Sequence, residues 1–159
     1  MRPKLKDYTA NRFRRNGGIS VTSAVHRTTC RVIYADTDNM GIAYHANYFR
    51  WFEIGRTELF RKCGLPYREI EKQGYFLPIA EAGCRFRAPA RYDDLLVIET
   101  ALDSSYRAAL QCNYTVFGED GQGIVAEGFT KHACVDIKGR VVRPPDFLLE
   151  FVAAQALSE

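Results

Sequence analysis

Apolar residues recur at helical spacing in one long segment, residues 47–63. Charged residues avoid the line of five residues at intervals of three or four: Tyr48, Phe52, Gly55, Leu59 and Cys63. Four more apolar residues widen this surface beyond a narrow stripe: Phe49, Trp51, Ile54 and Phe60. The pattern predicts a helix that other structure encloses, with Gly64 as its C-terminal cap.

Alternation of apolar and polar residues predicts strands on both sides of this helix. One strand, residues 28–36, precedes it, and four follow, at residues 76–88, 95–102, 107–117 and 124–137. The Gly- and Asp-bearing loop 119–123 is typical of a hairpin. A short helix or turn is expected at 65–73 and a short helix at 144–154. These elements predict an α+β domain in which a curved antiparallel sheet wraps one long central helix.

Length and composition fit a single globular domain. The 159 residues can bury a core of their own, and no apolar run approaches the roughly 18 residues of a membrane span. The basic N-terminus lacks the apolar run of a secretory signal, so we expect a cytoplasmic location. The five cysteines are scattered without a C-x-x-C pair, so we expect neither a disulfide framework nor a metal site.

Positive charge is concentrated at the N-terminus. Residues 1–27 hold seven Lys or Arg against the single acid Asp7, a charge of +6, so a net +3 leaves −3 for the rest. We expect a poorly ordered basic tail over 1–27, the folded domain over 28–152 and a C-terminal end over 153–159. Nucleic-acid or lipid binding by the tail stays open, but the body lacks the basic stripe with stacking aromatics that nucleic-acid binding favours.

Candidate chemistry is densest where the first predicted strand ends and the long helix begins. A helix N-terminus presents unpaired N–H groups and a positive dipole end, which can stabilise an oxyanion. Asp38, in the loop just ahead, is the natural base or nucleophile, and Gly41 allows close backbone approach. His45 is a titratable partner near the helix start. Residue types alone leave turn or capping roles open for Asp36 and Asp38, and a surface role for His45.

The same region carries a resemblance to a known family. Its motif reads Tyr34-x-Asp36-x-Asp38-x-x-Gly41-x-x-Tyr44-His45-x-Asn47-Tyr48, continued by Phe52-Glu53-x-x-Arg56-Thr57-Glu58 and by Phe86-x-Ala88-Pro89-Ala90-x-Tyr92-Asp93-Asp94. This resembles the 4-hydroxybenzoyl-CoA thioesterase superfamily, nearest to its Tol-Pal-associated (YbgC-type) acyl-CoA thioesterases. The resemblance implies a hotdog fold, a homodimer or homotetramer, and hydrolysis of an acyl-CoA to free acid and CoA. It implies no cofactor, since CoA is part of the substrate.

The resemblance also implies roles for individual catalytic residues. Asp38 matches the aspartate that attacks the thioester or activates water, and Asp36 matches the other acid of the motif, which is not catalytic. His45 matches the helix-start position whose backbone N–H polarises the thioester carbonyl, with its side chain also implicated. Tyr34 matches the tyrosine that accompanies these two residues.

Three further positions are expected to contact substrate. Gly41 and Tyr44 belong to the loop and helix start that would hold the carbonyl oxygen, and Arg107 matches a residue that contacts CoA phosphate in aryl-CoA members. One departure from the family pattern is Asn39-Met40, where members often carry small or proline residues.

Two rival functions stay open. A hotdog dehydratase or hydratase of 3-hydroxyacyl thioesters would use a carboxylate on the long helix, a part that Glu53 could play. A non-catalytic acyl-CoA-binding domain would keep the pocket without turnover. The sequence does not separate nucleophilic from general-base catalysis, nor an aliphatic from an aromatic acyl chain.

Overall fold

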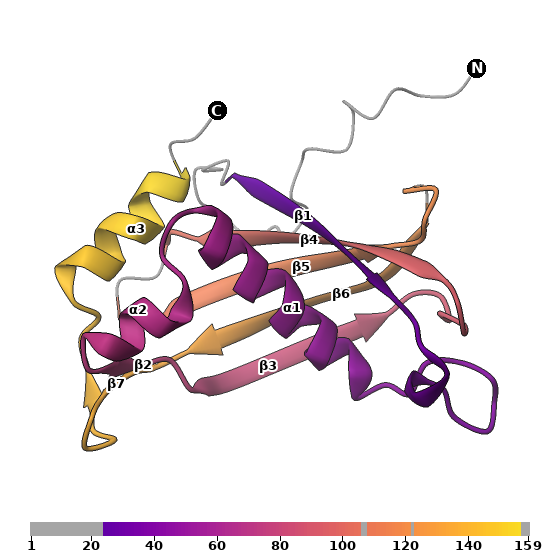
Figure 1. Cartoon of the computed structure of the whole chain (residues 1–159), viewed down its shortest axis with the longest axis horizontal. Coiled ribbons are helices and arrows are strands. Elements are labelled where there is room, and N and C mark those ends of the chain that lie inside the picture. Colours follow the sequence, from indigo (N-terminus) through magenta and orange to yellow (C-terminus); the bar gives the residue numbers. More distant parts are fainter. Residues whose placement is uncertain (1–23, 106–107, 122, 157–159) are drawn as a thin grey trace.

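The computed structural model describes residues 24–105, 108–121 and 123–156 of the chain. One long helix, α1 (Asn47–Lys62), lies across a five-stranded sheet, and two shorter helices, α2 (Tyr67–Lys72) and α3 (Asp146–Ala156), lie near its C-terminal end (Figure 1). The sheet comprises β1 (Val25–Arg31), β3 (Ile79–Phe86), β4 (Leu95–Asp103), β5 (Leu110–Phe117) and β6 (Ile124–His132). A smaller sheet comprises β2 (Tyr75–Phe76), β7 (Cys134–Asp136) and β8 (Val141–Val142).

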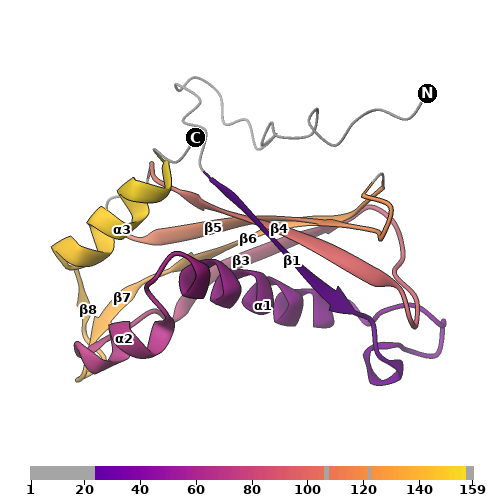
Figure 2. The same cartoon turned by 45° about the horizontal axis from the view of Figure 1, so that its top comes forward.

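The large sheet has the order β1-β4-β5-β6-β3, and every neighbouring pair is antiparallel. The small sheet has the order β2-β7-β8 and lies beside α2, away from the start of α1 (Figure 1). Figure 2 shows the strands of the large sheet passing over α1, which covers one of its faces. The predicted α+β architecture with one central helix is therefore confirmed.

Two glycines allow the helix to lie close to the sheet. A Cβ on Gly55 would overlap Thr100 and come within 2.9 Å of Ile98 Cγ2, both on β4. On the sheet side, a Cβ on Gly128 would overlap the ring of Phe52. That ring stacks on Tyr114 of β5 at 4.4 Å between centroids. The predicted buried line of α1 is thus the face that meets the strands.

Several strand boundaries differ from the predicted ones. The first strand begins at Val25 instead of Thr28 and ends at Arg31, and residues Tyr34–Asp36 form a 3-10 turn (η2). The segment 76–88 divides into β2 and β3 at Pro78, which has no N–H for a ladder. The segment 124–137 divides at Ala133, whose N–H donates to Pro78 O at 3.1 Å. The rest of the predicted tail, residues 1–23, lies outside the described residues.

Candidate active site

The loop between η2 and α1 closes on itself. Thr37 forms a β-bridge with Ala43, and the Asp38 N–H donates to Ile42 O at 2.9 Å. The Gly41 N–H then donates back to Asp38 O at 2.9 Å. Gly41 has a φ of 71°, in the left-handed region where a side chain is disfavoured. The loop therefore has a defined shape, and Gly41 is needed for its backbone conformation.

Asp38 has one carboxylate oxygen committed to this loop. Its Oδ1 accepts the Met40 N–H at 2.8 Å, which makes an Asx turn, and the residue is half-buried. Within the described ranges, no donor contacts its Oδ2. The turn role left open by the sequence is therefore real, and it leaves one carboxylate oxygen available for chemistry.

The start of α1 offers backbone donors beside the loop. The N–H groups of Asn47, Tyr48 and Phe49 donate to the carbonyls three residues before them, at 3.0, 3.3 and 3.2 Å. The N–H groups of His45 and Ala46 meet no acceptor in the part of the chain that the structure describes. The positive end of the helix dipole points the same way. This end of α1 can accommodate a developing negative charge on a carbonyl oxygen.

The side chains of the other predicted site residues are exposed. His45 and Tyr44 both face solvent, and their rings pack at 4.3 Å between centroids. Tyr34 is 79% exposed and meets the ring of Tyr92 edge-on at 5.8 Å. Among the described residues, no hydrogen bond joins Asp38 directly to Tyr34 or His45. Arg107 lies outside them.

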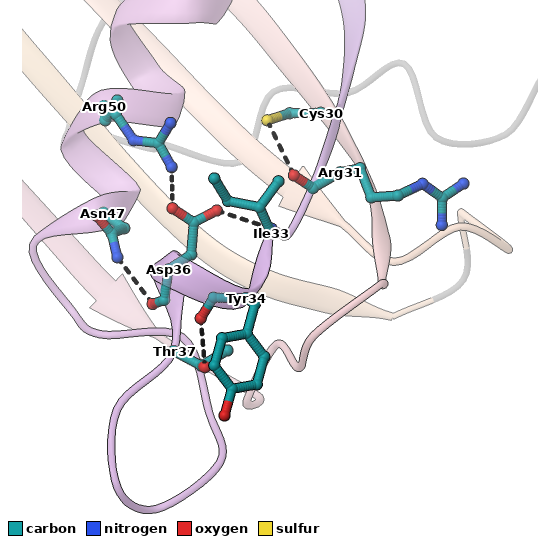
Figure 3. Close-up of polar contacts among 8 residues, drawn as sticks. All are labelled: Cys30, Arg31, Ile33, Tyr34, Asp36, Thr37, Asn47 and Arg50. Carbon is teal, nitrogen blue, oxygen red and sulfur yellow. Dashed lines mark hydrogen bonds and ion pairs between the residues drawn. The ribbon is translucent and has the colours of Figure 1, made fainter.

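Asp36 has a structural role in holding the loop against α1. It is only 3% exposed, and its carboxylate accepts the Ile33 N–H at 3.0 Å and pairs with Arg50 (Figure 3). Its backbone carbonyl accepts two further bonds, from the Tyr44 N–H and from Asn47 Nδ2, both at 2.8 Å. These bonds leave Asp38, and not Asp36, as the acid that is available to a substrate.

Arg91 also contacts the loop, although the sequence analysis did not single it out. Its Nη1 donates to Gly41 O at 3.4 Å, and the neighbouring Ala90 O accepts the Ala43 N–H at 2.8 Å. The only signal in the sequence was its place inside the third stretch of the motif, between Ala90 and Tyr92. This arginine brings a positive charge to the rim of the site.

Apolar side chains around the loop are open to solvent in the single chain. Six large residues in or beside it are each 48% exposed or more: Ile33, Tyr34, Met40, Tyr44, Phe86 and Tyr92. Phe86, at the end of β3, also contacts Tyr48 in the first turn of α1 at 5.0 Å between ring centroids. Such a concentration of exposed apolar surface is typical of a binding or interaction site.

Across residues 24–105, 108–121 and 123–156, no group of three or more His, Cys, Asp or Glu is placed to hold a metal ion. None of the helices in those same ranges is long and apolar enough to cross a membrane. Glu53, the carboxylate of the rival hydratase reading, lies exposed on α1.

Comparisons with known families and solved structures identify relatives of this chain. A model of the thioesterase-like superfamily matches residues 32–152. The acyl-CoA thioesterase YbgC of Haemophilus influenzae is 30% identical over 125 residues, which cover 78% of this chain and 89% of that protein. A DHNA-CoA thioesterase structure from Staphylococcus aureus matches with a TM-score of 0.77 and 28% identity, covering 84% of this chain and 93% of that one.

A second solved structure is that of a 4-hydroxybenzoyl-CoA thioesterase, in which an aspartate is mutated to asparagine and 4-hydroxybenzoyl-CoA is bound. It matches with a TM-score of 0.73 and 25% identity, covering 82% of this chain and 99% of that one. With these structural matches, the predicted hotdog fold is confirmed.

Proposed function

This chain belongs to the thioesterase-like superfamily, and from that membership we propose that it hydrolyses an acyl-CoA thioester to a free carboxylic acid and CoA. The observation that carries the proposal is the pairing of two features at one end of α1. Among the described residues, Asp38 keeps one carboxylate oxygen uncommitted, and the helix start beside its loop presents unpaired N–H groups. A carboxylate and an oxyanion site are the two parts that thioester hydrolysis needs.

In this mechanism the thioester carbonyl oxygen lies against the backbone N–H of His45 or Ala46. Asp38 then takes a proton from water while the water oxygen bonds to the carbonyl carbon. The C–S bond breaks, and the CoA thiolate leaves and takes a proton, for which the protonated His45 ring is the donor. In the alternative route, Asp38 itself attacks the carbonyl carbon, the C–S bond breaks with release of the CoA thiolate, and water hydrolyses the resulting mixed anhydride. Each step uses a carboxylate, backbone N–H groups and an imidazole, so the proposal invokes no metal and no organic cofactor.

The aromatic residues at the loop would contact the substrate. Tyr34 and Tyr44 are exposed there, with an apolar ring and a polar hydroxyl each. Arg107 remains our proposal for a contact to CoA phosphate. The bound 4-hydroxybenzoyl-CoA of the related Asp-to-Asn mutant shows that a relative with this fold accepts an aryl-CoA. The acyl chain that this protein prefers stays open between aliphatic and aromatic.

We also propose that a second copy of the chain completes the site, in a homodimer or homotetramer. Among the described residues, the edge strand β3 pairs only with β6, and six of its eight residues are exposed. Ile79 and Phe86, at its two ends, are 50% and 48% exposed. A free, partly apolar edge next to an open site is a surface that another strand can cover.

The cysteines support a reducing compartment. All five are free thiols, including the buried Cys112 and Cys134. Proteins of oxidising compartments commonly use cysteines in disulfides, so we propose a cytoplasmic location.

Thiol release is the experiment that tests the function. The purified protein is offered short aliphatic, long aliphatic and aromatic acyl-CoA thioesters, and free CoA is followed with a thiol reagent. Release with at least one class, abolished in the Asp38→Asn variant, supports the proposal. Binding without release identifies an acyl-CoA-binding domain, and conversion of a 3-hydroxyacyl-CoA without thiol release identifies a hydratase. Either of those two results overturns it.

A further inference from the structure

The backbone carbonyl of Asp36 is a junction between the loop and the helix. It accepts the Tyr44 N–H, at the end of the loop, and Asn47 Nδ2, in the first turn of α1, both at 2.8 Å. Figure 3 shows the Asn47 amide reaching Asp36 from the helix. One oxygen atom thus links the segment just ahead of Asp38 to the helix start just after His45.

The Asp36 carboxylate fixes the same residue from the other side. It accepts the Ile33 N–H and pairs with Arg50, one turn further along α1 (Figure 3). Because Asp36 is 3% exposed, its negative charge needs this partner. The Arg50 side chain is 48% exposed, so it contributes little to the core itself. Asp36 is therefore held at both its side chain and its backbone by residues of α1.

We propose that Asn47 and Arg50 are positioning residues, which set the distance between the Asp38 carboxylate and the N–H groups at the start of α1. The inference rests on the proposed function. Asp38 is two residues after Asp36, and His45 directly follows Tyr44, so the bonds at Asp36 restrain both reacting parts through short lengths of chain. Displacements of about 1 Å between reacting groups can cost about 10²-fold in rate.

The first experiment changes Asn47 to Ala. Asn47→Ala removes the hydrogen bond from Asn47 Nδ2 to Asp36 O. Asp38 and the backbone N–H groups at the start of α1 remain present in this variant. We expect kcat to fall at least about 10-fold while KM stays within about 3-fold of the parent value. The reason is that the substitution disturbs the alignment of the reacting groups and not the binding of the substrate. The melting temperature should fall by about 2–4 °C, the effect of one hydrogen bond in a domain of this size.

Asn113→Ala is the matched control. Asn113 is a second asparagine with one side-chain bond, because its Oδ1 accepts Gln111 Nε2 at 2.9 Å. It pairs with Ala101, which pairs with Val25 at the far end of β1 from the loop. This variant should lose a similar few degrees and keep kcat within about 2-fold. Equal losses of kcat in both variants, or normal kcat in Asn47→Ala, would overturn the proposal.

Two substitutions of Arg50 test whether its positive charge is needed for the positioning. Arg50→Lys keeps a cation for Asp36 and should retain at least about half of the parental kcat, whereas Arg50→Met should lose about 10-fold or more. If both variants keep parental kcat, Arg50 has no positioning role.

Hydrogen exchange supplies a readout that does not depend on turnover. In Asn47→Ala, amides of the segment 37–45 should exchange faster than in the parent, while those of β5 stay unchanged. If the parent releases no CoA from any thioester but Asn47→Ala shows this faster exchange, the proposed function is wrong, while the restraint of the loop by Asn47 is supported. If the parent is active and exchange is unchanged in Asn47→Ala, only the restraint by Asn47 is wrong.

Discussion

In the proposed mechanism, Asp38 combines a structural and a chemical task on its two carboxylate oxygens. Asparagine at this position keeps an oxygen for the Met40 N–H but removes the charge and the basicity. We predict that Asp38→Asn lowers acyl-CoA turnover by at least about 10²-fold, the low end for positioned base catalysis. The melting temperature should stay close to that of the parent, because the Asx turn survives. Steady-state thiol release and thermal unfolding of the same preparation measure both quantities.

The structure also decides which variant is a fair control for that change. Asp36→Asn is not inert, because it would remove the buried carboxylate charge that pairs with the half-exposed Arg50. Asp103 is a better match, since its Oδ1 accepts the Ser105 N–H at 2.9 Å in the same kind of turn. The register of β1 and β4 places it at the sheet end away from the loop. Asp103→Asn should keep full turnover, and a loss like that of Asp38→Asn would contradict our assignment.

At the level of single residues, the sequence motif and the turn-forming residue types predicted much of the candidate site. Asp38, Gly41, Tyr44 and His45 do lie in one loop at the start of the long helix. The partners of Asp36 could not be predicted, because its pairing with Arg50 depends on how the η2 turn meets α1. Whether Tyr34 and Arg107 act on substrate stays a prediction.

Among the elements, α1 depends on a glycine that helix propensity alone would disfavour. Alanine at position 55 would gain about 1 kcal/mol in helix propensity, but its Cβ would overlap Thr100 and crowd Ile98. Overpacking of this kind costs about 1–3 kcal/mol. We predict that Gly55→Ala lowers the free energy of unfolding in urea.

A second substitution checks the cause of that loss. The Thr100 hydroxyl is buried without a hydrogen-bond partner among the described residues, so removing it costs little. Thr100→Ala combined with Gly55→Ala should recover part of the lost stability. A double variant as unstable as the sum of the two single variants would show that crowding at Thr100 is not the reason.

His132 links β6 to the segment ahead of β3 and gives the fold a pH dependence. Its Nδ1 contacts Leu77 O and its Nε2 contacts Thr130 Oγ1, both at 2.9 Å. Burial, which disfavours the cation, and then the nearby Arg56 charge lower its pKa from 6.5 to about 4. Below pH 6.5 the imidazole of His132 is protonated in the unfolded chain. In the folded chain it stays neutral until the pH falls to about 4. Stability present above pH 6.5 is therefore lost as the pH falls toward 4.

The size of this effect can be isolated with one variant. Between pH 7 and pH 4.5 we predict that His132 accounts for a loss of about 2 kcal/mol in the free energy of unfolding. His132→Gln removes the titrating group, so its stability should fall less than that of the parent over the same interval in urea titrations. Parallel curves for the two proteins would mean that His132 titrates normally.

Periodicity predicted the elements well where one face is buried throughout, as in α1, β4 and β5. It predicted them less well where long-range bonds decide the boundary. Pro78 divides one predicted strand, and its carbonyl takes the Ala133 N–H and divides another. The two-residue strand β8 was not predicted, because its pairing with β7 comes from the turn at Gly139, not from alternation.

For the whole molecule, the candidate site of a single chain is bordered by exposed apolar surface. The Asp38 loop is surrounded by exposed apolar side chains, and the neighbouring edge strand β3 is exposed over most of its length. Burying apolar surface stabilises an assembly by roughly 25 cal/mol for each Å² removed from water, before the costs of association. No pattern within one sequence could predict the covering of this surface directly, because in the proposed assembly the covering surface belongs to another copy.

We therefore predict that the protein is at least a dimer in solution and that the assembly is needed for activity. Light scattering should give a mass of about twice or four times 18.1 kDa at micromolar concentrations. If the partner chain completes the site, the turnover per chain should fall on dilution at the concentration where the measured mass falls. An 18.1 kDa particle with full thioesterase activity would show that one chain is sufficient and that the exposed surface around Asp38 serves the substrate alone.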